Sequence, residues 1–173
     1  MTRHEGRSDS DGQHPGPEQT PRLRLKPKAP VSGHVDGAWW PQTDDLAAEL
    51  PDLLAVLSVR LGTIDRVLYN LAEWAQMPKR LTTGGRAVRL DGYRLQPANT
   101  LQVMGLGREK ILLLVVPPHT DADIAHEAMM TAAAPSDVTA VGDLLAIGAH
   151  SGGEAADDYH RSTFRRRVRR LRP

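Results

Sequence analysis

The sequence contains no cysteine and few aromatic residues, which make up 4% of its 173 residues. The lack of cysteine excludes disulfides, thiolate nucleophiles and metal sites that depend on cysteine ligands. No apolar run approaches the roughly 20 residues needed to span a bilayer, and the N-terminus lacks the apolar core of a signal peptide. We therefore expect a cytoplasmic protein that is not an integral membrane protein.

Lysine is also scarce, with four lysines against eighteen arginines. The formal net charge of +1 hides an uneven distribution. Residues 1–21 hold two arginines and four acidic residues, whereas residues 150–173 hold seven arginines and three acidic residues. The middle of the chain is nearly neutral, which argues against a strongly nucleic-acid-binding fold there.

Composition divides the chain into one domain and two tails. Residues 1–21 have no apolar periodicity and residues 149–173 have low apolar content, so both are predicted to be disordered. Residues 22–148 are predicted to form a single α+β domain, a size that one hydrophobic core can serve.

The apolar pattern predicts a mostly antiparallel sheet of about five strands, packed with two helices. The expected strands are Arg22–Lys26, Ile64–Leu71, Arg86–Leu90, Thr100–Met104 and Ile111–Val116. The last of these is apolar at six consecutive positions, which predicts a strand at the sheet centre with both faces covered.

Two helices are predicted from spacing and capping signals. Leucines at helical spacing follow the candidate cap Thr43 as far as Gly62, with a kink expected at Pro51. A second helix is expected over Asp121–Ala134, and residues 137–149 are a candidate third helix. The turn signal Thr82-Thr83-Gly84-Gly85 lies between them.

The segment Gly33–Pro41 (GHVDGAWWP) holds two of the three tryptophans between two glycines and a proline. We interpret it as an irregular loop that packs against the core. Because adjacent residues of an extended chain point to opposite sides, Trp39 is expected in the core and Trp40 partly exposed. Together with His34 and Asp36, Trp40 would form the floor of a small contact site.

This segment also carries a resemblance, together with DLAAELP at 45–51, DRVLYNL at 65–71 and LLLVVPP at 112–118. Over roughly residues 22–134 the chain resembles a family of small actinobacterial proteins that is catalogued as a domain of unknown function. The resemblance implies a bacterial cytoplasmic protein with one domain. It supplies no activity, no cofactor and no catalytic residue.

Polar side chains near the second predicted helix are the candidate metal ligands. They are His119, Asp123, His126 and Glu127, and the last three share one helix face. The competing interpretation is a helix N-terminus with acidic residues that favour its dipole and a solvated histidine. Their spacing matches no named metal signature, and the chain has no nucleophile or nucleotide-binding motif.

The C-terminal segment is a candidate polyanion contact. Its arginines are Arg165, Arg166, Arg167, Arg169, Arg170 and Arg172. Phe164, Val168 and Leu171 form a narrow apolar stripe at helical spacing, which suits an anionic membrane surface or nucleic-acid phosphates. The alternative is a solvated tail with weak, salt-sensitive affinity for polyanions.

Three functions remain open from the sequence. The first is a small non-enzymatic binding domain that contacts a protein partner or a second copy through the Trp39–Trp40 loop. The second is a nucleic-acid or membrane accessory protein that acts through the arginine-rich tail. The third is a metal-dependent enzyme. No catalytic residue and no cofactor are predicted.

Overall fold

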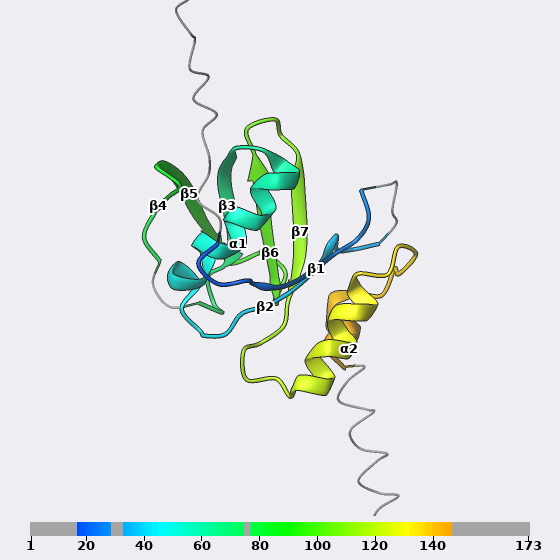
Figure 1. Ribbon diagram of the computed structural model, residues 1–173. Coiled ribbons are helices and arrows are strands. Elements are labelled where there is room, and N and C mark those ends of the chain that lie inside the picture. Colours follow the sequence, from blue (N-terminus) through cyan, green and yellow to red (C-terminus); the bar gives the residue numbers. More distant parts are fainter. Residues whose placement is uncertain (1–16, 29–32, 75–76, 147–173) are drawn as a thin grey trace, which may run out of the picture.

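The structure is a computed structural model that describes residues 17–28, 33–74 and 77–146 (Figure 1). Its elements, in chain order, are β1 (Arg22–Leu25), β2 (Gly37–Trp40), α1 (Leu46–Leu61), β3 (Ile64–Asn70), β4 (Arg80–Thr83), β5 (Arg86–Tyr93), β6 (Thr100–Gly105), β7 (Lys110–Val115) and α2 (Ala122–Ala132). A further helical segment covers residues 141–146. Within the described ranges, no helix is both long enough and apolar enough to cross a membrane.

The strands form one mixed sheet in the order β1-β2-β7-β6-β3-β5-β4. The pairs β2–β7 and β3–β5 are parallel, and the other four neighbouring pairs are antiparallel. The α+β class is confirmed, but the expected count of about five strands was too low. The two additional strands are β2 and β4.

One face of the sheet packs against α1, the helix in front of the strands in Figure 1. The buried leucines of α1 are Leu46, Leu50, Leu53, Leu54, Leu57 and Leu61. They share a core with Trp39 and with inward residues of β3, β5, β6 and β7, such as Val67, Leu90 and Leu101. The leucine spacing therefore predicted the buried face of α1 correctly.

The opposite face is covered over β2 and β7 by α2 and the 141–146 segment. Ala125, Ala128 and Leu144 pack there against Ala38 and Leu114. Because Leu113 faces α1 and Leu114 faces α2, and both are fully buried, β7 is covered on both faces. It lies third in the strand order, next to the central strand β6.

The tryptophan segment is part of the sheet rather than an irregular loop. β2 pairs antiparallel with β1 and parallel with β7, so Trp39 lies opposite Leu23 and Val115. Gly37 permits a close approach of β1, because a Cβ at this position would meet the carbonyl oxygen of Arg24. The hydrogen-bonded pairing of β2 with β1 and β7, which are distant in sequence, therefore makes Gly37–Trp40 a strand although glycine disfavours strands.

The helix boundaries also differ from those expected. Asp45 caps α1 in place of Thr43, and its carboxylate accepts a hydrogen bond from the Ala48 N–H at 3.2 Å. α1 is continuous through Pro51. The carbonyl that this proline leaves without a helical partner belongs to Ala47, on a half-exposed turn where water can replace the missing bond.

Candidate functional site

Trp39, a candidate binding residue as part of the Trp39–Trp40 loop, is a core residue with 1% of its surface exposed, as strand alternation predicted. Its ring stacks on that of Trp74, with 6.3 Å between the ring centroids and 19° between the ring planes. Stacking of two large rings inside the α1 core fixes one end of β2 against the chain that follows β3. Trp39 therefore has no surface to offer a ligand.

Trp40 is half-buried, and its ring makes a hydrogen bond at the indole nitrogen and a cation contact on one face. Its indole N–H donates to the carbonyl oxygen of Pro118 at 3.3 Å. The guanidinium of Arg22 lies 3.5 Å from the ring centroid, and Arg22 also donates to the carbonyl oxygens of Trp40 and Pro41. Burial by this packing lowers the pKa of Arg22, an effect that nearby Glu49 opposes. One ring face of Trp40 is thus already covered.

Asp36 immediately precedes β2, whereas Trp40 is its last residue. They are four residue steps apart along the extended chain, a span of about 13 Å. The Asp36 carboxylate accepts the N–H of Leu112 at 2.8 Å, while the Asp36 N–H donates to the Leu112 carbonyl at 2.7 Å. His34 is exposed before the strand. The structure gives Asp36 a role in holding β7 and does not bring it to Trp40.

The candidate metal ligands do not converge. His119 lies 2.9 Å from a carboxylate oxygen of Asp44, at the N-terminal side of α1. Asp123, His126 and Glu127 are exposed on α2. Over residues 17–28, 33–74 and 77–146, no three histidine or acidic side chains are placed to hold a metal ion. The candidate polyanion contacts, Arg165 to Arg172, lie outside the described residues.

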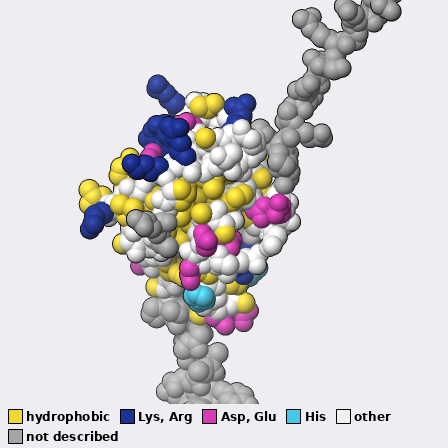
Figure 2. Space-filling model, turned by 90° about the vertical axis from the view of Figure 1, so that its left-hand side faces the viewer, with side chains coloured by type: hydrophobic (Ala, Val, Ile, Leu, Met, Phe, Trp, Pro, Cys, Tyr) yellow, Lys and Arg dark blue, Asp and Glu magenta, His cyan; other side chains and the backbone are white. Residues whose placement is uncertain are grey.

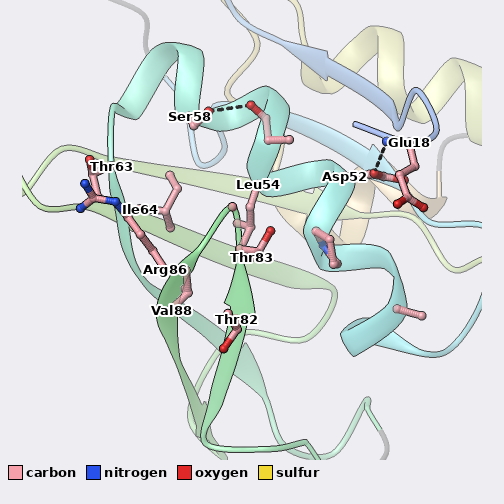
Figure 3. Close-up of a pocket in the computed structure, with 14 residues that line it drawn as sticks. Glu18, Asp52, Leu54, Ser58, Thr63, Ile64, Thr82, Thr83, Arg86 and Val88 are labelled. Atoms are coloured by element: carbon pink, nitrogen blue, oxygen red, sulfur yellow. Dashed lines mark hydrogen bonds between the residues drawn. The ribbon is translucent and has the colours of Figure 1, made fainter. Parts of the chain in front are cut away.

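A groove of about 400 Å³ separates α1 from the β4–β5 hairpin, a site that was not predicted from the sequence. α1 contributes Ala48, Pro51, Asp52, Leu54, Ala55 and Ser58. The hairpin contributes Thr82, Thr83, Gly84, Arg86 and Val88. Glu18 and the start of β3, at Thr63 and Ile64, complete the lining. Figure 3 shows Leu54 and Thr83 facing each other across the middle of this groove.

The β4–β5 hairpin forms the wall of the groove opposite α1, and its outer strand, β4, is an edge strand of the sheet. Gly84 and Gly85 have φ values of 55° and 73°, the left-handed conformation that a two-residue hairpin turn requires. The Leu90 N–H donates to the Lys79 carbonyl, so the alternating ladder turns the N–H and C=O of Arg80 and Thr82 outward. β4 is the last strand of the sheet, and both residues are exposed.

Charges of opposite sign mark the two ends of the groove. At one end, the Asp52 carboxylate accepts the N–H groups of Glu18 and Gln19 at 2.7 and 3.0 Å, which holds the acidic Glu18 side chain nearby. At the other end, Arg86 reaches toward Thr63 (Figure 3). Figure 2 shows a hydrophobic band on this side of the molecule, with basic side chains above it and acidic side chains beside it.

The groove could have been found only in part from the sequence. Ala48, Ala55 and Ser58 are small residues on the side of α1 away from its leucine stripe. Small side chains on an outer helix face are common, however, and they indicate a hollow only when another element stands opposite. That element is the hairpin, which the parallel pairing of β5 with β3 brings to α1.

Comparisons with known proteins place the chain in a family without assigning an activity. No curated protein and no solved structure matches it. A family model matches residues 22–132, which span every strand and both α1 and α2. The match confirms the resemblance to a domain of unknown function that the sequence motifs indicated. The chain belongs to a family of unknown function, DUF5994.

Proposed function

We propose that this protein is a small non-enzymatic binding domain whose contact surface is the groove between α1 and the β4–β5 hairpin. The single observation that carries the proposal is the combination of a hollow of about 400 Å³ with an unpaired strand edge on its wall. The proposal keeps the class expected from the sequence and moves its surface away from the tryptophan segment. In this proposal Trp39 and Trp40 have a structural role, because Trp39 packs in the core and Trp40 contacts Arg22 and Pro118.

The chemistry of the lining supports binding of an extended polypeptide. Main-chain N–H and C=O groups at the open edge of β4 can pair with another extended chain, and such pairing gives affinity largely independent of side chains. Small and apolar residues such as Ala55 and Val88 leave room for alternate side chains of the bound segment. Thr83, which lies on the same face of the hairpin as Val88, adds a hydroxyl group beside them.

The same lining favours binding over catalysis. The titratable side chains that line the groove are Glu18, Asp52 and Arg86. Both carboxylate oxygens of Asp52 already accept backbone N–H groups, so this residue is engaged in holding the N-terminal segment. The shifted pKa of Glu73, raised by burial, belongs to a residue outside the groove lining.

Selection from a displayed library of seven-residue peptides would test the proposal. The variant Ala55→Arg fills the groove with a long charged side chain. Val59→Arg places the same side chain one turn further along α1, where Val59 is 90% exposed and outside the lining. We expect wild type and Val59→Arg to enrich the same peptides and Ala55→Arg to lose them.

The backbone signals of the full chain provide the second measurement. A selected peptide should shift the amide resonances of Arg80 and Thr82, and methylation of alternate peptide N–H groups should abolish binding, because strand pairing needs those donors. Failure to enrich any peptide, or enrichment that Ala55→Arg leaves intact, would contradict the proposal.

A further inference from the structure

The groove has a charge polarity and a length, and together they define its ligand more narrowly. We propose that it takes a segment of four to five extended residues with a basic side chain at one end and a carboxylate at the other. This inference rests on the proposed function and concerns which polypeptide is bound.

The length follows from the part of α1 that lines the groove. The lining runs from Ala48 to Ser58, ten residue steps at a rise of about 1.5 Å each, or about 15 Å. An extended chain advances about 3.3 Å per residue, so four to five residues cover this length. β4 has four residues and is matched to the same span.

The polarity follows from the two ends. Glu18 and Asp52 present carboxylates at the end where the N-terminal segment crosses α1, and a lysine or arginine of the ligand would meet them there. Arg86 is exposed at the other end, and among the described residues it forms no ion pair. A carboxylate of the ligand would be its partner. Between these ends the lining is small or apolar.

A second copy of the chain fits this surface poorly. Two copies related by a two-fold axis through β4 would bring one hollow against another, because an isologous interface uses the same patch on both subunits. Two concave surfaces leave space between them, and specific interfaces are packed as densely as protein interiors. A strand-like segment of another protein fills the groove and pairs with β4 at the same time.

The inference is tested by the charge pattern of the peptides that the full chain selects. With wild type we expect enriched sequences to carry lysine or arginine at one end and aspartate or glutamate three or four positions away. With Arg86→Glu the acidic residue should be replaced by a basic one, and with Glu18→Lys the basic residue should be replaced by an acidic one. Both substituted residues are exposed, so the variants are expected to fold.

The affinity of a selected peptide for wild type and for Arg86→Gln gives a quantitative test of the same inference. Replacing the peptide's acidic residue by glutamine should weaken binding to wild type about two- to fivefold, as expected for an exposed ion pair, and should have no effect on Arg86→Gln. Enriched peptides without a charge pattern, or with the same pattern for wild type and Arg86→Glu, would overturn this inference and leave the proposed function standing. A library that yields no peptide would overturn both.

Two further outcomes would assign the groove to another occupant and overturn the inference. A dimer in sedimentation that Ala55→Arg dissociates and Val59→Arg does not would identify a second copy. Amide signals of residues 1–16 that shift in Ala55→Arg, with no peptide added, would identify the chain's own N-terminal segment.

Discussion

The guanidinium carbon of Arg22 lies 3.5 Å from the centroid of the Trp40 ring, and Nε of Arg22 donates to the Trp40 carbonyl oxygen at 3.0 Å. Arg22 begins the edge strand β1, so one side chain joins this edge to β2 through a ring contact and a hydrogen bond. A planar guanidinium suits this arrangement, because its face can stack on the ring while its N–H groups donate at fixed angles in its own plane.

Loss of this contact should loosen the β1 edge. We expect Arg22→Gln to lower the free energy of unfolding by about 2–4 kcal/mol, the sum expected for a cation–π contact and a charged hydrogen bond. Chemical denaturation would measure it. Arg24→Gln is the matched control, because Arg24 is an exposed arginine of the same strand. Equal effects of the two substitutions would show that the ring contact contributes nothing.

The two adjacent tryptophans should differ in their contribution to stability. Trp39→Ala removes a buried ring from the stack with Trp74 and should cost about 3–5 kcal/mol. Trp40→Ala removes a half-buried ring and one indole hydrogen bond, so the loss should be smaller. Thermal unfolding of both variants gives the comparison, and equal losses would be inconsistent with the difference in burial.

Gly37 should tolerate no side chain. A Cβ at this position meets the Arg24 carbonyl oxygen and the Leu25 Cα, so Gly37→Ala must push β1 away from β2. We expect a loss of about 1–3 kcal/mol, as for other overpacked positions. At Gly107, an added Cβ has no neighbour within 4 Å, so Gly107→Ala should change stability by less than about 0.5 kcal/mol. Chemical denaturation should therefore show a lower midpoint for Gly37→Ala and an almost unchanged midpoint for Gly107→Ala.

Glu73 should make stability depend on pH. Glu73 is exposed as a residue, but partial burial of its carboxylate raises its pKa above the ordinary value of 4.5, and the hydrogen bond that this carboxylate accepts from the Asn99 N–H lowers the pKa by a smaller amount. A raised pKa in the folded state favours the protonated form. The contribution of Glu73 to stability is therefore fully present below about pH 4.5 and is lost as the pH rises through the folded pKa.

Glu73→Gln keeps an oxygen that can accept the Asn99 N–H and removes the charge. Its melting temperature should exceed that of wild type at pH 7, and the difference should close as the pH falls below 4.5. Glu127→Gln, at an exposed position of α2, is a control expected to have little effect at pH 7. A difference between Glu73→Gln and wild type that widens toward low pH would contradict this prediction.

The elements predicted correctly from the sequence are those whose apolar pattern lies within a single segment of the chain. The leucine spacing of α1 determines which face is buried, because helical geometry alone brings these residues to one side. The apolar run that became β7 predicts a strand with both faces covered for a similar reason, since every position must avoid water. The placement of Trp39 inside and Trp40 partly outside also follows from strand alternation.

The remaining features depend on contacts between residues far apart in the chain. β2 is a strand because β1 and β7 supply its hydrogen-bonding partners, as in the bond from the Val116 N–H to the Trp39 carbonyl oxygen. The polar strand β4, with the sequence RLTT, has little apolar pattern and is defined by its ladder with β5. The groove exists only because the pairing of β3 with β5 brings the hairpin against the outer side of α1. The amino-acid sequence determined which residues avoid water, whereas the tertiary structure decided which surfaces face each other, because strand pairing depends on hydrogen bonds between segments distant in sequence.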